Sequence, residues 1–192
     1  IDPFTSHNTL ILFCDILDAV KKNSYKRDPR GIAKKAELYL KSTGIGDKAY
    51  VGPEPEFFVF DDVRYKNDMN ETSFAIDSNE GPYNTGRKYE SGNMGHRPGI
   101  KGGYFPVPPV DSAQDMRGEY LKGLRDVGIK VEKHHHEVAP SQHELGMYFR
   151  TLVEQADNVQ LYKYVVHMVS HSFGKTATFM PKPVKGDNGS GM

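Results

Sequence analysis

Cysteine is almost missing from the chain, and tryptophan is missing altogether. Cys14 is the one cysteine among 192 residues, so no disulfide can form within a chain, and a reducing cytoplasm is the simplest location to expect. No apolar run approaches the roughly 20 residues that a helix needs to cross a bilayer. The N-terminus also has neither the basic nor the apolar region of a signal peptide. We therefore expect a cytoplasmic chain that does not enter a membrane.

A net charge is also lacking, because 25 Lys and Arg residues are balanced by 25 Asp and Glu residues. Without an excess of positive charge, the chain has no general attraction for nucleic acid or for an anionic membrane. This balance excludes a general nucleic-acid binder but not a single bound nucleotide. The length and the 37% hydrophobic content are typical of one globular domain.

Runs of apolar residues predict five strands. They cover residues 9–16, 50–60, 129–137, 144–150 and 176–180. Two stretches fit no regular element. Pro53 and Pro55 lack the N–H that a ladder needs, so this part of a strand is expected at an edge or a bulge. Residues 61–103 are rich in Asn, Asp, Ser and Gly, and we expect a long loop there that is functional or disordered.

Apolar residues at helical spacing predict three helices. They cover about residues 29–43, 112–127 and 152–172. Asp28 is suited to the N-cap of the first helix, and Ser112 with Asp115 resembles a capping box at the second. The mixed order of helices and strands predicts an α+β fold with an antiparallel contribution to its sheet. Residues 1–5 resemble a cloning leader, and we exclude them from the expected fold.

Carboxylates and imidazoles gather in residues 129–144. This stretch contains Glu132, Glu137, Glu144, His134, His135, His136 and His143. Such groups together bind metal ions or move protons. Strict strand alternation divides the stretch, with Glu132, His134 and His136 on one face and Lys133, His135 and Glu137 on the other. Both faces can line one site only if the strand twists sharply or carries a bulge.

A second acidic pair, Glu54 and Glu56, lies far upstream. Residues two apart on a strand face the same side, with their Cα atoms about 6.7 Å apart. Two like charges at 4 Å repel by roughly 4 kcal/mol at an effective dielectric near 20, so a proton or a cation is expected between them. Mg²⁺ or Mn²⁺ suits such oxygen ligands. The alternative is a solvated strand face, against which the flanking proline and phenylalanine residues argue.

Other readings of these residues stay open. A zinc site on the histidine run lacks a nearby thiolate, and the spacing fits no closed zinc motif. His167 and His171 lie one helical turn apart, and we interpret them as structural because the zinc-protease pattern is absent. The closing GDNGSGM at 186–192 is either a flexible tail or a ligand-binding turn whose glycines allow backbone amides to approach an anion.

Taken together, these stretches resemble the catalytic domain of bacterial class I glutamine synthetase, the glutamate–ammonia ligase. Six motifs in order carry the resemblance. They are CDILD at 14–18, RDPRGIAKKAE at 27–37, GPEPEFFVFDD at 52–62, KGGYFPVPPVDSAQDMR at 101–117, HHHEVAPSQHE at 134–144, and YKYVVHMVSHSFGKTATFMPKP with GDNGSGM at 162–192. The resemblance implies that residues 6–192 are the N-terminal portion of that domain, with part of its antiparallel barrel backed by helices. The family's N-terminal β-grasp domain and the C-terminal half of its catalytic domain are expected to be absent.

The resemblance also implies site residues and ligands. Two or three Mg²⁺ or Mn²⁺ ions are expected in each site. Glu56, Glu137 and Glu144 match the ligands of one ion, and Glu54 matches a ligand of the ion beneath the phosphates of ATP. Glu132 matches a nucleotide contact, and Asn188 with Gly189 matches the segment that holds the substrate glutamate. Tyr104 and Glu137 are similar to residues that line the ammonium site.

The function implied is synthesis of glutamine from glutamate, ammonia and ATP through γ-glutamyl phosphate, in nitrogen assimilation. A homo-oligomer, in full-length relatives a dodecamer, is expected. Because family motifs beyond Met192 are lacking, we expect this chain to be an inactive fragment. The alternatives are a ligase that joins glutamate to a polyamine, and a non-catalytic structural relative. A structural protein has no use for unpaired acids, which argues against the second alternative.

Overall fold

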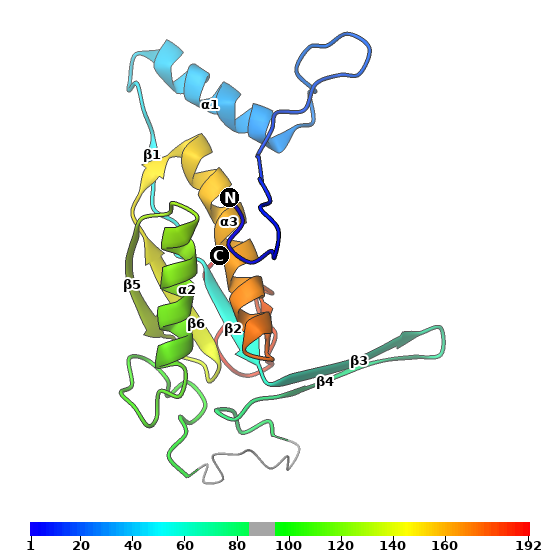
Figure 1. Cartoon of the computed structure of the whole chain (residues 1–192), viewed down its shortest axis with the longest axis vertical. Coiled ribbons are helices and arrows are strands. Elements are labelled where there is room, and N and C mark those ends of the chain that lie inside the picture. The colour runs from blue at the N-terminus through cyan, green and yellow to red at the C-terminus, as the bar shows by residue number, and fades with distance from the viewer. Residues whose placement is uncertain (85–94) are drawn as a thin grey trace.

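Four antiparallel strands form the central sheet, in the order β5-β6-β2-β8 (Figure 1). The structure is a computed structural model that describes residues 1–84 and 95–192. The strands are β5 (Val131–His136), β6 (Gln142–Met147), β2 (Glu56–Phe60) and β8 (Thr176–Thr178). The helices α2 (Gln114–Asp126) and α3 (Leu152–Ser172) pack on one side of this sheet. The predicted α+β fold with antiparallel strands is therefore confirmed.

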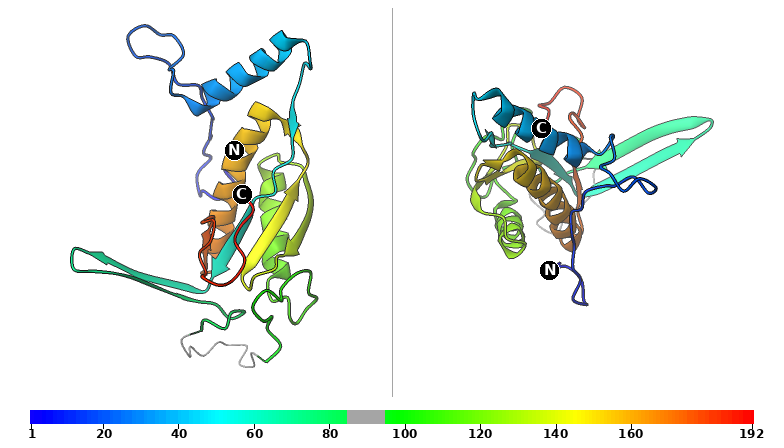
Figure 2. Two further views of the ribbon diagram at one scale, coloured as in Figure 1. Left: turned by 180° about the vertical axis from the view of Figure 1, so that it is seen from behind. Right: turned by 90° about the horizontal axis from the view of Figure 1, so that it is seen from above.

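The two faces of the sheet differ because side chains alternate along each strand. We call the side toward α2 and α3 the helix-covered face; it carries Phe57, Val59, Leu145 and Ala177. We call the other side the open face; it carries Glu56, Phe58, Gln142 and Glu144. The C-terminal residues loop over the open face beside β2 (Figure 2).

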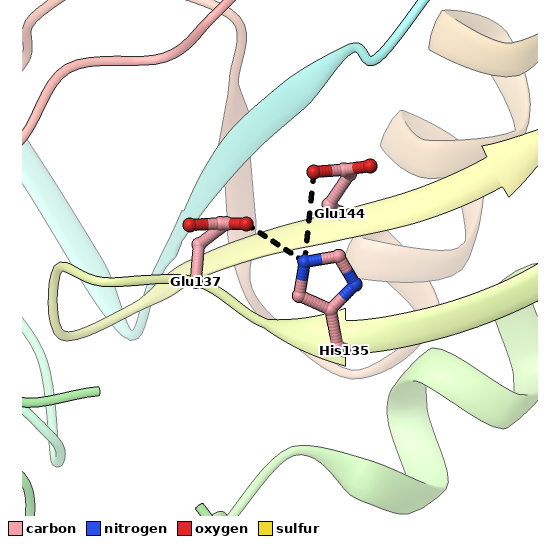
Figure 3. Close-up of side chains that lie close together, drawn as sticks. All are labelled: His135, Glu137 and Glu144. Carbon is pink, nitrogen blue, oxygen red and sulfur yellow. Dashed lines mark hydrogen bonds and ion pairs between the residues drawn. The ribbon is translucent and has the colours of Figure 1, made fainter. Parts of the chain in front are cut away.

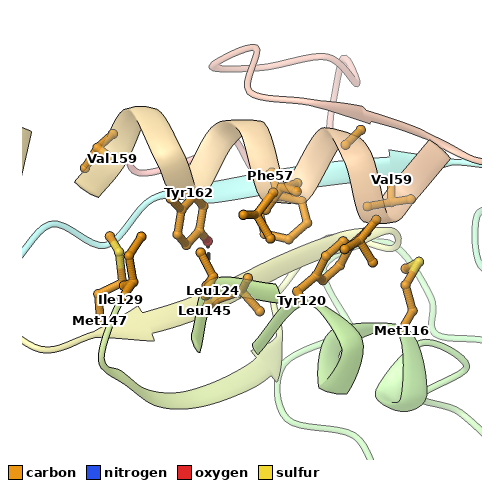
Figure 4. Close-up of a cluster of buried hydrophobic side chains, with 14 of the residues drawn as sticks. Phe57, Val59, Met116, Tyr120, Leu124, Ile129, Leu145, Met147, Val159 and Tyr162 are labelled. Atoms are coloured by element: carbon orange, nitrogen blue, oxygen red, sulfur yellow. Dashed lines mark hydrogen bonds between the residues drawn. The ribbon is translucent and has the colours of Figure 1, made fainter. Parts of the chain in front are cut away.

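The main hydrophobic core lies between the helix-covered face and the two helices (Figure 4). The ring of Phe57 lies edge-on to Tyr120 of α2 and to Tyr162 of α3, with centroid distances of 5.4 and 6.2 Å. Leu124 and Leu145 are fully buried in the same cluster. Burial of each such side chain stabilises the fold by roughly 1.5–3 kcal/mol, so this core fixes the sheet on which the open face is built.

The first helix, α1 (Pro29–Thr43), has the predicted ends. The Asp28 carboxylate accepts hydrogen bonds from the backbone N–H groups of Arg30 and Gly31, and Gly44 takes the left-handed conformation with φ of 72°. Arg30 also forms an ion pair with Asp157 of α3 at 3.0 Å. None of the helices described has the length and hydropathy that crossing a membrane requires.

The prediction of a structureless 61–103 segment is wrong for its first part. Strands β3 (Asp62–Asp68) and β4 (Glu71–Asp77) form a hairpin that projects from the body (Figures 1 and 2). Both strands are largely exposed, so the sequence lacks the apolar alternation that predicts a half-buried strand. Cross-strand contacts such as Lys66 to Glu71 at 2.5 Å stabilise the pairing instead. Residues 85–94 of the expected loop lie outside the described residues.

Three local predictions also differ from the structure. Residues 9–16 form no strand in the described chain, and the run is exposed. The predicted strand at 50–60 is divided into β1 (Tyr50–Val51) and β2, because Pro53 and Pro55 interrupt the ladder; β1 pairs with β7 (Arg150–Thr151). The capping box is wrong: α2 begins at Gln114, and the Ser112 hydroxyl donates to the Glu80 carboxylate at 2.7 Å.

The first residues contact the folded body. The Asp2 carboxylate accepts a hydrogen bond of 2.6 Å from the Tyr164 hydroxyl, and the Phe4 ring lies edge-on to the Tyr164 ring at 5.9 Å. Asp2 is only 7% exposed. Asp2 and Phe4, within the segment 1–5 that the sequence led us to exclude as a leader, therefore pack against α3.

Candidate functional site

The pairing of three strands places acids and an imidazole in one row on the open face. Glu56 of β2 lies directly opposite Glu144 of β6, and Glu144 lies directly opposite His135 of β5. Side chains paired in this way have Cβ atoms about 4.5–5.5 Å apart. Glu137 follows His135 by two residues and points to the same side. We call these four residues, Glu56, His135, Glu137 and Glu144, the acid cluster.

Three residues of the acid cluster, His135, Glu137 and Glu144, lie close together (Figure 3). Nε2 of His135 donates a hydrogen bond to Oε1 of Glu137 at 2.7 Å and lies 3.5 Å from Oε2 of Glu144. One ligand atom from each of these three residues lies within 4.8 Å of the others. The three residues are only 5 to 8% exposed, so water screens their charges poorly.

The charges of the acid cluster are not balanced. Burial raises the pKa of Glu56, and the nearby charge of Glu137 raises it further. Burial likewise raises the pKa of Glu144, with added repulsion from Glu137 and Glu54 that the His135 ring only partly offsets. Burial acts in the same direction on Glu137, but the hydrogen bonds from His135 and from the Val138 N–H, with the charge of His135, together outweigh it and lower the pKa of that carboxyl. An added cation would relieve this repulsion.

The donor set suits a divalent ion. Carboxylate oxygens are the ligands that Mg²⁺ and Mn²⁺ prefer, and imidazole is also accepted by Mn²⁺ and Zn²⁺. Nδ1 of His135 is buried without a hydrogen-bond partner in the described part of the chain. A buried polar atom of this kind is uncommon and calls for a partner. The residues present therefore fit a metal ion, and the open face, not the whole histidine run, supplies them.

Glu54 lies at the border of the acid cluster, and Glu132 lies three residues before His135 in β5. Glu54 is exposed just before β2, and its charge raises the pKa of both Glu56 and Glu144. In β5 the register shifts between Val131 and Lys133, which is the bulge that the sequence required if both faces were to line one site. A Cβ placed on Gly146 would lie 3.6 Å from the Cβ of Glu132, so Glu132 lies beside β6.

Tyr104 reaches the acid cluster from a loop that runs along the end of β5. The backbone N–H of Gly103 donates to the Val138 carbonyl at 2.9 Å. A side chain at residue 103 would meet the Glu137 carbonyl at 2.7 Å, so this close approach requires glycine. The Tyr104 ring is 60% exposed and edge-on to the His135 ring at 5.9 Å, while Phe105 stacks on the same ring at 4.4 Å.

The C-terminal pair Asn188 and Gly189 is tied to the acid cluster through Gln142. The side-chain amide of Gln142 donates to the Gly189 carbonyl at 2.9 Å and to Oε2 of Glu56 at 2.6 Å. Gln142 was not among the predicted site residues, and His135 was considered only as part of the histidine run, without an assigned role. Strand alternation contained the signal for both, since each lies two residues from a predicted ligand, Glu144 or Glu137.

The remaining histidines of the run face the helix-covered side. Nδ1 of His136 donates to the Glu137 carbonyl and Nε2 to the Glu80 carboxylate, both at 2.7 Å. Because both partners are acceptors, the ring carries both protons, in keeping with a pKa that Glu80 raises against the effect of burial. Arg117 donates to His134 at 3.2 Å. The His136 and His143 rings lie edge to face at 5.0 Å. These rings are part of the packed interior.

Known proteins match the chain over nearly all of its length. The family described as "Glutamine synthetase, catalytic domain" matches residues 26–192. The glutamine synthetases of Rhizobium meliloti (strain 1021) and Salmonella typhimurium (strain LT2) are 64% and 58% identical to this chain over 191 and 193 residues. Both alignments cover 100% of this chain but 41% of the relative. The chain therefore spans about two fifths of the length of these curated relatives.

Solved structures agree with this match. A cryo-EM structure of Plasmodium falciparum glutamine synthetase superposes with a TM-score of 0.81 at 32% identity, over 89% of this chain and 34% of that one. A second structure, a GmaS–ADP complex, superposes with a TM-score of 0.62 at 20% identity, over 88% of this chain and 33% of that one, which concerns the fold alone.

Proposed function

The chain belongs to the glutamine synthetase family, and from this premise we propose that its acid cluster holds a divalent cation for ATP-dependent synthesis of glutamine. The observation that carries the proposal is the row of Glu56, Glu144 and His135 across three strands, with Glu137 beside it. Burial and mutual repulsion raise the pKa of two of these acids, so the fold holds them together at the expense of stability.

The proposed metal ligands are Glu56, Glu137 and Glu144 for one Mg²⁺ or Mn²⁺ ion, with Glu54 contributing to a second. Bound divalent ions offset charge on phosphoryl oxygens. The part played by the chain itself is to fix the carboxylates: β2 and β6 hold Glu56 and Glu144 in register, and the hydrogen bond from His135 orients Glu137.

The same site is proposed to receive the substrates. Glu137, whose lowered pKa keeps it ionised at neutral pH, attracts the ammonium ion beside Tyr104. Glu132, at the bulge of β5, is proposed to contact ATP. Asn188 and Gly189 are proposed to hold glutamate, since Gln142 ties Gly189 to the cluster.

The reaction proposed for the full-length protein has two steps. The γ-carboxylate of glutamate attacks the terminal phosphate of ATP, and ammonia then displaces phosphate from γ-glutamyl phosphate. We propose that residues 6–192 are the N-terminal portion of the catalytic domain and that the full-length protein is a homo-oligomer. The present chain by itself is expected to show no glutamate- and ammonium-dependent ATP turnover, because Glu54 is the sole ligand that it is proposed to offer the second ion.

A Mn²⁺ titration by calorimetry tests the metal site. We compare the unaltered chain with the double variant Glu56→Gln, Glu137→Gln, which keeps the shape of both side chains and removes both charges. The control is Glu71→Gln, Glu119→Gln, because both of these acids are exposed and distant from the cluster. We expect binding by the unaltered chain and the control, and loss of binding in the cluster variant. Equal binding by all three chains, or none by the unaltered chain, contradicts the proposed site.

A further inference from the structure

Gln142 uses every hydrogen-bonding group of its side chain, although it binds no substrate in the proposal above. It begins β6 and is 1% exposed. Its Nε2 donates to Oε2 of Glu56 at 2.6 Å and to the Gly189 carbonyl at 2.9 Å, while its Oε1 accepts from the Ala139 N–H at 3.2 Å. Both acceptors face the nitrogen and the donor faces the oxygen, so the orientation of the amide is determined by its partners.

The two acceptors belong to different parts of the chain. Glu56 is a strand residue and a proposed metal ligand, whereas Gly189 belongs to the 186–191 segment that loops over the open face. The same segment approaches Glu56 a second time at Gly191, where an added Cβ would lie 3.0 Å from Oε1 of Glu56. The Glu56 carboxylate therefore lies close to the segment and is hydrogen-bonded to it through Gln142.

Neither leucine nor glutamate in place of Gln142 preserves this bridge. Leucine has a similar volume but no donor for either oxygen. Nε2 of Gln142 now lies 2.6 Å from Oε2 of Glu56. A glutamate at position 142 would put a carboxylate oxygen in place of that nitrogen, and two like charges at that separation repel strongly. An amide supplies two N–H donors to two acceptors and leaves the charge of the acid cluster unchanged.

We propose that Gln142 is a positioning residue that couples the acid cluster to the 186–191 segment. The inference rests on the proposed function, because it treats Glu56 as a metal ligand. An ion on Glu56 restricts the carboxylate, which favours the Gln142 bridge and thereby the ordered segment. Coupling of binding free energies is reciprocal, so an ordered segment also strengthens ion binding at Glu56.

The metal-free test is hydrogen exchange of the Ser190 and Gly191 amides in the unaltered chain and in Gln142→Leu. We expect these amides to exchange about tenfold faster in the variant, which is the lower end expected for loss of a hydrogen bond to a charged group. The control is Gln155→Leu, which replaces another glutamine that is 1% exposed, on α3. Any change in amide exchange caused by Gln155→Leu should not be confined to the 186–191 segment.

The second readout is the affinity for Mn²⁺, measured for the same three chains. Loss of a group that orients a metal ligand weakens binding by about tenfold or more. We expect this loss in Gln142→Leu and not in Gln155→Leu. A residue that merely packs would lower the unfolding temperature and leave both the local exchange and the affinity unchanged, and that result overturns the proposal. Failure of the unaltered chain to bind Mn²⁺ contradicts the metal site instead, and the metal-free exchange still decides whether Gln142 holds the segment.

Discussion

Histidine and glutamate side chains lie on both faces of the central sheet, but partners balance their charges on the helix-covered face alone. On the helix-covered side, the Glu80 carboxylate accepts hydrogen bonds from His136, from Ser112 and from the backbone N–H of Ser141, all at 2.7 to 2.8 Å. Burial opposes ionisation of Glu80, yet His136 holds the pKa of that carboxyl far below its ordinary value.

On the open face the acids outnumber their partners. Glu56 and Glu144 have raised pKa values. A single imidazole, that of His135, lies 2.7 Å from Glu137 and 3.5 Å from Glu144. The same residue types therefore stabilise the fold on one side and strain it on the other. Strain of this kind is typical of sites that await a ligand. The comparison indicates that charge balance, more than residue type, separates structural from functional histidines here.

The largest effect is expected from breaking the ion pair of Arg117 with Asp111 on the helix-covered side. Both side chains are buried, and Nη1 of Arg117 lies 2.9 Å from Oδ1 of Asp111. Arg117→Met leaves the Asp111 charge without its cation, and we expect a loss of about 3–5 kcal/mol in the free energy of unfolding. Urea unfolding followed by circular dichroism measures it. Arg125→Met, an exposed arginine of the same helix, is the control and should change stability little.

A smaller loss is expected from Glu80→Gln, about 1–3 kcal/mol at neutral pH, because the variant keeps the shape but not the charge that His136 requires. The pKa of Glu80 in the folded protein is lower than its ordinary value of 4.5, so its contribution is present above pH 4.5 and is lost as the pH falls through the folded value. The stability difference between the two chains should therefore shrink below pH 4.5. A constant difference, or a pH trend shared by the exposed control Glu119→Gln, would contradict this.

Tyr162→Phe should lower the free energy of unfolding by a smaller amount, about 1 kcal/mol. The Tyr162 hydroxyl donates to the Pro55 carbonyl at 2.8 Å and accepts from the Leu145 N–H at 3.3 Å, so it links β6 to the segment just before β2 from the helix-covered side. Thermal unfolding compares it with Tyr65→Phe, whose ring is 81% exposed on the β3–β4 hairpin. If the two variants lose the same stability, the hydroxyl makes no net contribution to this link.

The sequence predicts the elements whose formation depends on residues close together in the chain. The structure confirms the helix over residues 152–172, which the sequence predicts from an apolar stripe that repeats over many turns. It also confirms α1, whose ends the sequence marks with Asp28 and Gly44. The β3–β4 hairpin was missed, since an exposed two-stranded ribbon has no buried face to impose alternation. The apolar run at 9–16 predicts a buried strand, but an apolar run does not specify a pairing partner.

Contacts between distant segments could not be predicted from local pattern. The motif resemblance associated Glu56 with Glu144, but the register that places them opposite each other depends on the pairing of β2 with β6. Glu80 drew no attention at all, because its role arises where three segments meet around one carboxylate. Strand alternation places Gln142 on the same face as Glu144, but its bridging role could not be predicted, because its partners lie on another strand and near the C-terminus.

The unfolding temperature of Glu144→Gln, with and without saturating Mn²⁺, tests the contrast between the faces most directly. Without metal, the variant relieves repulsion within the acid cluster, so we predict that it is more stable than the unaltered chain by about 0.5–1 kcal/mol, opposite in sign to Glu80→Gln. With Mn²⁺ the order should reverse, because the unaltered chain gains more from binding. A metal-free variant less stable than the unaltered chain, or an equal gain from Mn²⁺ in both, would contradict the claim that the open face awaits a cation.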